Sequence, residues 1–175
     1  MPDPSQLLKN GNFDFSYDNW SFFEGAHLKQ LSEEGINNVA FIPNWTNAQF
    51  AGFMQNQIEF DPVNGQFFTL TFKAKFEINY SAEQTFITLK NGDGSVIISS
   101  VDITDQITAN LPQRPRRWSP QANQWGIYTV NFDASSHDFV DDNTVSLLVL
   151  PEYRFLDIEE SNILIYDLNL SQQLV

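Results

Sequence analysis

The sequence predicts an all-β protein built as a two-sheet antiparallel sandwich, and three observations support this prediction. Short segments with an apolar residue at every second position recur along the chain, which is the periodicity of half-buried strands. Turn-forming residues separate these segments, and no convincing amphipathic helix interrupts them. Phenylalanine is abundant, with 16 copies in 175 residues, and large flat side chains suit the space between two packed sheets.

The alternating pattern predicts about ten strands. In chain order they cover residues 7–15, 20–31, 39–42, 48–60, 66–78, 84–90, 95–103, 125–132, 144–150 and 162–170. The clearest is 66–78, where apolar residues alternate with threonine and lysine, so that one face is apolar and the other polar. Residues 61–65 contain Pro62 and Gly65 and predict a tight turn between 48–60 and 66–78. The Asn-Gly-Asp-Gly run at 91–94 predicts a hairpin turn.

One long segment, residues 104–123, lacks the strand pattern. It is polar and carries three prolines, so it predicts a long loop inside a single domain spanning residues 1–175. A domain of this length buries roughly 70% of the surface of its unfolded chain, so it needs neither a disulfide nor a metal merely to fold. The chain contains no cysteine, which excludes disulfides and thiolate chemistry.

The strong negative charge of the chain disfavours two classes of binding partner. The formal net charge is −13, with an isoelectric point near 4.2, so a phosphate backbone or an anionic membrane surface would be repelled. We therefore expect neither nucleic acid nor membrane as a partner. The first residues carry no basic region and no apolar run, and no stretch has the length of a membrane span, so neither a signal peptide nor a membrane anchor is expected.

No catalytic constellation is visible, and we expect the protein not to be an enzyme. His27 and His137 stand far apart without partners at ligand spacing. The chain holds no nucleophile elbow, phosphate-binding glycine loop or zinc-protease pair. A glycosidase needs two carboxyl groups across a cleft, one of them in an apolar setting. The carboxylate pairs here are adjacent in sequence and predict solvated turns, at Glu33-Glu34, Asp141-Asp142 and Glu159-Glu160.

The four arginines gather in two places, which is unusual in such an acidic chain. Three of them precede a tryptophan, as Arg114, Arg116, Arg117 and Trp118, and the fourth forms the pair Tyr153-Arg154. The arginines could neutralise nearby carboxylates and dock the long loop onto the sandwich. Alternatively they form a contact site for a glycan or a neighbouring subunit, because tryptophan and arginine dominate interface energetics.

Four segments, in chain order, together carry a resemblance to a known family. They are Leu7-Leu8-Lys9-Asn10-Gly11-Asn12-Phe13-Asp14 followed by Trp20, then Asn56-Gln57-Ile58-Glu59-Phe60 followed by Gly65 and Phe68-Thr69-Leu70-Thr71-Phe72, then Trp125–Phe132, and finally Ile163–Leu170. In this order they are similar to the galactose-binding-like carbohydrate-binding modules. The resemblance implies a two-sheet antiparallel jelly-roll β-sandwich. It also implies a structural calcium ion between the first and last strands, held by Asn12, Asp14 and Asp167.

The resemblance further implies a sugar site in which aromatic rings are flanked by polar side chains. If Met54, Ile58 and Phe60 face the core, the alternate residues of the same strand line an exposed sheet. The candidates for ligand contact are therefore Phe53, Gln55 and Gln57, together with Trp45 in the preceding loop. Trp20 and Trp125 match positions that are usually in the core.

The function expected from these observations is a non-catalytic jelly-roll binding or assembly protein with glycan-binding potential. Its partners would be glycans, neighbouring protein subunits, or both. A virion surface component, such as a phage head-decoration or tail-fibre protein, fits the expected lack of a signal peptide and places the protein on a virion or extracellular surface. The alternative is a carbohydrate-binding module associated with a glycoside hydrolase.

Overall fold

The computed structural model describes residues 2–43, 51–76, 84–103, 125–139, 143–152 and 162–173. Within these residues the strands are β1 (Ser21–Phe23), β2 (His27–Leu31), β3 (Ile36–Ile42), β4 (Gly52–Glu59), β5 (Phe67–Phe76), β6 (Gln84–Asn91), β7 (Ile97–Asp102), β8 (Gly126–Asp133), β9 (Thr144–Glu152) and β10 (Ile163–Gln172). Two short 3₁₀ turns, η1 (Ser32–Glu34) and η2 (Pro62–Asn64), follow β2 and β4. The described residues include no helix with the length and apolar character that a membrane crossing requires.

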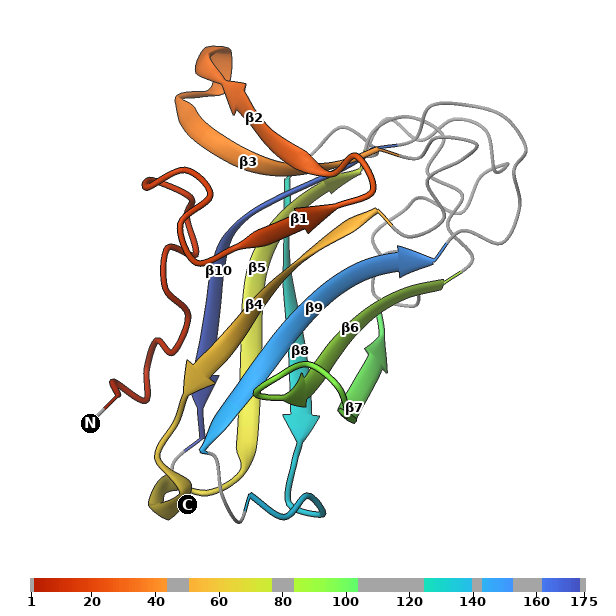
Figure 1. The fold of residues 1–175 in the computed structure, drawn as a ribbon. Helices are drawn as coiled ribbons and strands as arrows, with labels where there is room; N and C mark the ends of the chain where they lie inside the picture. Colours follow the sequence, from red (N-terminus) through yellow and green to blue (C-terminus); the bar gives the residue numbers. More distant parts are fainter. Residues whose placement is uncertain are drawn as a thin grey trace.

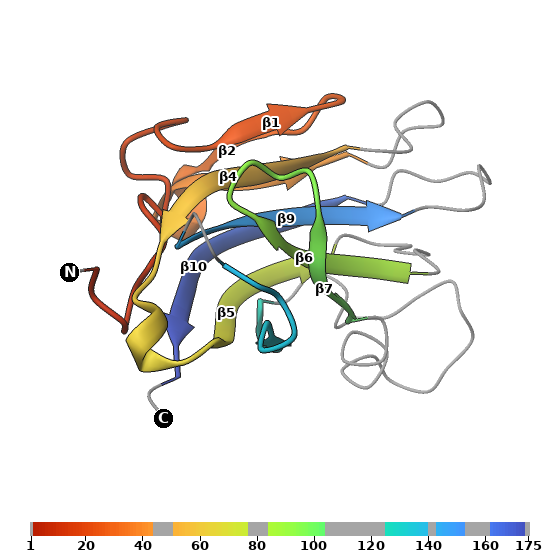
Figure 2. The same ribbon diagram turned by 60° about the horizontal axis from the view of Figure 1, so that its bottom comes forward.

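The strands form two antiparallel sheets of five strands each. Sheet A has the order β1-β4-β9-β6-β7, and sheet B has the order β2-β3-β10-β5-β8. Figures 1 and 2 show the two sheets as facing layers, with β4 and β9 of sheet A over β10 and β5 of sheet B. This arrangement confirms the predicted two-sheet antiparallel sandwich.

The core lies between the sheets and is built by the strand alternation. On β5, Phe68, Leu70 and Phe72 point inward and are almost completely buried, while the threonines between them and the lysines that follow point outward. From sheet A, Leu147 and Val149 of β9 are buried against the same core. Each fully buried side chain of this size stabilises the fold by about 1.5–3 kcal/mol relative to exposure.

Residues 7–15 were predicted as a strand, and this prediction is wrong. They form turns, because Asn10 uses its side chain to hold the following loop: its Nδ2 donates to the carbonyl oxygens of Ser16 and Asp18, and its Oδ1 accepts from Phe15 N. Asn10 also has a left-handed backbone with φ of 55°. Asparagine competes with the strand ladder through such local bonds.

Residues 4–11 lie along the side of the sandwich, and we call them the N-terminal strap. Gln172 N donates to Pro4 O, Leu7 N donates to Leu170 O at 2.7 Å, and Leu168 N donates to Gly11 O at 2.9 Å. The strap is thereby bonded to β10 of sheet B. Figure 1 shows this red segment beside β10 and the edge of β4.

The single strand predicted over 20–31 is two strands in two different sheets. Glu24 and Gly25 have φ values of 54° and 90°, which turn the chain sharply between β1 and β2. The predicted turns at 61–65 and 91–94 are confirmed. The first connects β4 of sheet A to β5 of sheet B, and the second closes the β6–β7 hairpin.

Candidate functional site

The outer face of sheet B gathers lysines and aromatic rings. Three of the five lysines of this acidic chain lie there, each with its ammonium group over a ring. The distances from Nζ to ring centre are 5.0 Å for Lys29 and Phe41, 5.3 Å for Lys73 and Tyr166, and 5.7 Å for Lys75 and Trp125. We call these six residues the lysine–aromatic face. A cation over a ring contributes about 0.5–1 kcal/mol at an exposed site.

The register of sheet B places these side chains together. Lys73 and Lys75 point outward because Phe72 and Ala74 of β5 point into the core. Tyr166 of β10 is paired with Lys73, so its ring lies on the same outer face. Trp125 immediately precedes β8, whose Gly126 is paired with Ala74. Residues distant in sequence therefore meet because adjacent strands carry them at matching positions.

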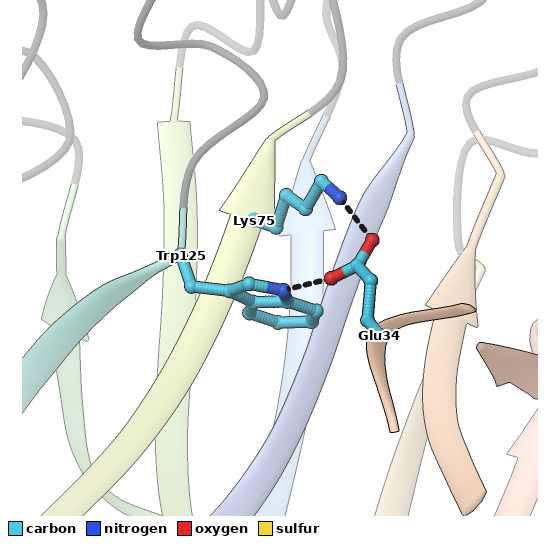
Figure 3. Close-up of polar contacts among 3 residues, drawn as sticks. All are labelled: Glu34, Lys75 and Trp125. Atoms are coloured by element: carbon cyan, nitrogen blue, oxygen red, sulfur yellow. Dashed lines mark hydrogen bonds and ion pairs between the residues drawn. The ribbon is translucent and has the colours of Figure 1, made fainter. Parts of the chain in front are cut away.

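Glu34 fixes two members of this face. Its Oε1 accepts a hydrogen bond from Lys75 Nζ at 2.6 Å, and its Oε2 accepts one from Trp125 Nε1 at 2.6 Å (Figure 3). The bond from Lys75, followed by the bond from Trp125, lowers the pKa of the Glu34 carboxyl below its ordinary value. Its contribution to stability is therefore present above the ordinary pKa and is lost only as the pH falls through the lowered value.

The prediction of a solvated turn at Glu33-Glu34 is thus correct for Glu33 and wrong for Glu34. Glu33 is exposed, but Glu34 is bonded to residues 41 and 91 positions further along the chain. The expectation that Trp125 lies in the core is also wrong, because its side chain is partly exposed. Its ring packs edge-on against Tyr166, with ring centres 4.8 Å apart and planes at 77°. Trp20 is buried in the core, as predicted.

A second ion pair lies on the same face. Lys73 Nζ is 2.9 Å from Asp167 Oδ2, and this hydrogen bond is the main cause that raises the pKa of Lys73 above its ordinary value. Both carboxylates of the face, Glu34 and Asp167, are therefore paired with lysines. A glycosidase requires a carboxylic acid whose pKa is raised, and Glu34 has the opposite shift.

The face continues into a polar surface along the same strands. Outward positions of β5, β8 and β10 carry hydroxyl and amide side chains: Thr69, Thr71, Thr129, Asn131, Asn169 and Ser171. Thr69 Oγ1 donates to Asn131 Oδ1 at 2.9 Å, which joins two of these strands. Aromatic rings beside hydroxyl and amide groups can both stack on an apolar ring surface and hydrogen-bond to hydroxyls.

The predicted exposed side of β4 is wrong for Phe53 and Gln55, because the strand contains a bulge. Phe53 is 0% exposed and Gln55 only 2%, so both face inward. The pairing of β4 with β9 shifts between Gln55 and Ile58, and Gln57 has a left-handed φ of 54°. The extra residue reverses the alternation, so that Ile58 is buried and Gln57 is exposed, as expected for these two.

The three residues assigned to calcium lie close to the N-terminal strap and on β10. Asn12 and Asp14 are both exposed and are hydrogen-bonded to each other through their side chains. Asp167 is paired with Lys73. Among the described residues, no three histidine, aspartate or glutamate side chains are grouped so that they could hold a metal ion. Calcium binding here stays a prediction.

The remaining predicted contact residues lie outside the described residues, as does the predicted loop at 104–123. These residues are Trp45, Arg114, Arg116, Arg117, Trp118, Tyr153 and Arg154. The lysine–aromatic face was not predicted from the sequence. The available signal was two lysines alternating with core residues on one strand, with a tryptophan at the start of another.

Comparisons with known proteins identify the fold. No family model matches the sequence, and no curated protein matches it. An arabinose-bound GH51 α-L-arabinofuranosidase matches with a TM-score of 0.66 at 10% identity, covering 96% of this chain and 26% of the other. The enzymatically active domain of tailspike protein 4 from bacteriophage CBA120 matches with a TM-score of 0.59 at 15% identity, covering 99% and 22%. This chain thus spans about a quarter of each.

Carbohydrate-binding modules match over their whole length. The xylan-binding CBM22-1 domain from Paenibacillus barcinonensis gives a TM-score of 0.56 at 9% identity, covering 100% of this chain and 99% of the other. Modules of families 4 and 16 give TM-scores of 0.54 and 0.55. At such identities the likeness shows the fold alone: a jelly-roll β-sandwich of the kind found in carbohydrate-binding modules.

Proposed function

We propose that this protein is a non-catalytic glycan-binding domain that holds its ligand on the lysine–aromatic face. The observation that carries the proposal is the pair of partly exposed rings, Trp125 and Tyr166, set among lysines and hydroxyl side chains on one sheet. The apolar face of a sugar ring would stack on an aromatic side chain, while its hydroxyls would bond to the surrounding polar groups. The full-length matches to carbohydrate-binding modules support this proposal.

Glu34 would prepare the face for its ligand. Its bond to Trp125 Nε1 holds the indole in one orientation, and its bond to Lys75 holds the ammonium group beside that ring. A ring that is ordered before binding loses less conformational freedom when the ligand arrives, which favours affinity. Glu34 therefore acts as a positioning residue.

Two biological settings remain candidates for this binding domain. The tailspike match supports a virion surface component, such as a tail-fibre or head-decoration protein, that attaches to a glycan outside the cell. The arabinofuranosidase match supports a module associated with a glycoside hydrolase. The native mass separates the two, because a fibre or decoration protein would assemble with neighbouring subunits, whereas a module tethered to a hydrolase needs no copy of itself.

The glycan proposal is tested by replacing Trp125 with alanine and measuring binding on a glycan array, then by titration against the best glycan. We expect affinity to fall by about 2 kcal/mol, roughly thirtyfold, as for a central aromatic contact. The matched control is Phe15→Ala, which removes a ring that is 72% exposed in the loop before β1. Equal glycan binding by the Trp125 variant and the wild type would remove the face from consideration.

We also propose that calcium binds near Asp14 and Asp167 and stabilises the folded chain. Metal at a hundredfold excess over its dissociation constant would add about 2.7 kcal/mol. For a chain of this size the melting temperature would rise by about 2–4 °C per kcal/mol. Chelator should reverse this rise in the wild type and in the control Asp138→Asn, but have no effect on Asp14→Ala. A wild-type melting temperature that changes with neither calcium nor chelator would contradict the proposal.

A further inference from the structure

A pocket opens at the side of the sandwich, away from the lysine–aromatic face. Its volume is about 430 Å³, within the range of roughly 300–1,000 Å³ that is usual for small-molecule sites. It lies between the N-terminal strap, the start of β1 and the bulge of β4. Its lining residues are Leu7, Lys9, Asn19, Trp20, Ser21, Gln55, Asn56, Gln57 and Ile58.

The pocket exists because β4 loses its neighbour partway along. β1 is paired with β4 only from Phe23 to Ser21, opposite Gly52 to Met54. Beyond Met54 the strap takes the place of β1, and it is attached by a side chain: Gln55 Oε1 accepts from Lys9 N at 2.9 Å, and Gln55 Nε2 donates to Lys9 O at 2.8 Å. The gap between the end of one neighbour and the start of the other is the pocket.

The buried amide of Gln55 points to a ligand. A carboxamide has two N–H donors and an oxygen with two acceptor positions. The strap uses one donor and one acceptor position of Gln55, and no other described residue is bonded to the amide. Gln55 is only 2% exposed and lines the pocket. A bound hydroxyl group would satisfy what is left, and an unpartnered buried donor otherwise costs about 1–3 kcal/mol.

One rim residue holds a backbone conformation that disfavours its side chain. Gln57 has φ of 54°, in the left-handed region where glycine is the least strained residue, whereas Asn19, with φ of 69°, is of a type that tolerates this region. At Gln57 the chain nevertheless places an amide at the pocket. Strain of this kind collects at binding sites, where the side chain is needed despite its backbone.

We infer that this pocket is a second ligand site, which takes one neutral, polyhydroxylated unit the size of a single sugar ring. Asn19 and Asn56 offer amides, each of which both donates and accepts, as a sugar hydroxyl does. Gln57 offers the two N–H donors of its amide, whose Oε1 already accepts from Thr144 Oγ1 at 3.3 Å. Leu7 and Ile58 supply the apolar surface. Lys9 is the one charged residue of the lining, so the lining offers no counterpart to a cationic ligand.

The test uses the whole chain and three probes: glucose, galactose and xylose. Each sugar is titrated while amide signals are followed by heteronuclear NMR. We expect at least one sugar to shift the signals of Lys9, Asn19 and Gln57, with weak affinity. The decisive variant is Gln57→Gly, because glycine accepts the left-handed backbone and removes only the side chain. We expect it to weaken binding at least about tenfold, the effect of one lost hydrogen bond to a ligand.

Two controls keep this inference separate from the proposed function. Gln30→Ala removes an exposed glutamine from β2, outside the pocket lining, and should bind the probes as the wild type does. Trp125→Ala should leave the pocket shifts intact. Shifts confined to Trp125 and Tyr166, or no shift near Gln57 with any of the three sugars, would overturn the second site while leaving the lysine–aromatic face untouched.

Discussion

Replacing Gly11 by alanine should destabilise the protein by about 3 kcal/mol, because overpacking costs about 1–3 kcal/mol and a lost hydrogen bond about 1 kcal/mol. A Cβ atom at Gly11 would lie 2.0 Å from the carbonyl oxygen of Leu168 and 3.1 Å from its carbonyl carbon. Both atoms are backbone, so neither can rotate away. The same residue also donates a hydrogen bond from Leu168 N to Gly11 O, and this bond would be lost when the strap moves aside. Thermal and urea unfolding measure the effect.

The control for this prediction is Gly35→Ala. Gly35 has φ of 71°, and a Cβ atom there would meet nothing within 4 Å. The substitution therefore adds only the strain of a left-handed alanine, about 1–2 kcal/mol. If the Gly11 variant is no less stable than the Gly35 variant, the strap can move away from β10 without a loss of folding free energy. Its close approach to β10 would then contribute nothing to stability.

Replacing Phe53 by alanine should cost about 3–5 kcal/mol, the usual range for removing a buried phenylalanine ring. Phe53 is 0% exposed, and its ring lies 5.3–6.0 Å from the rings of Phe13, Trp20 and Phe22. The substitution would leave a cavity on β4, lined by rings from β1 and from the loop before it. The matched control is again Phe15→Ala, which should change stability by no more than about 0.5 kcal/mol.

Chemical unfolding curves for the two variants measure this difference. A stable Phe53→Ala protein, with a midpoint close to that of the wild type, would contradict the inward orientation of this side chain. It would favour instead the outward orientation that simple alternation along β4 predicts. The experiment therefore tests the bulge as well as the core.

The local pattern of alternating apolar residues and turn-forming residues was sufficient to predict most strands and both tight turns. The alternation on β5 is uninterrupted, so its inward and outward residues follow directly from the sequence. On β4 the same method fails for Phe53 and Gln55, because a bulge at Gln57 shifts the alternation by one residue and no glycine or proline indicates it. The strand before residue 15 fails for a different reason: the side chain of Asn10 satisfies backbone groups that a strand ladder would otherwise take.

The lysine–aromatic face was beyond sequence reasoning because its contacts join distant segments. Glu34 meets Lys75 and Trp125 only after β2, β5 and β8 have been placed in one sheet. In the sequence, Glu34 is one of two adjacent carboxylates in a turn, and nothing near it indicates that it will bond to a distant lysine and tryptophan. The strand order of the sheet, which no short motif encodes, decides which side chains become neighbours.

The N-terminal strap also determines how the protein responds to a pulling force. The strap is antiparallel to β10, since Pro4, Leu7 and Gly11 are bonded in turn to Gln172, Leu170 and Leu168. A force applied between the two ends of the chain therefore loads these bonds one after another, beginning at Pro4, rather than all together in shear. Peeling the strap from β10 would remove the wall of the pocket that Leu7 and Lys9 form. If this domain works under tension, its side pocket would therefore open as the strap is pulled away.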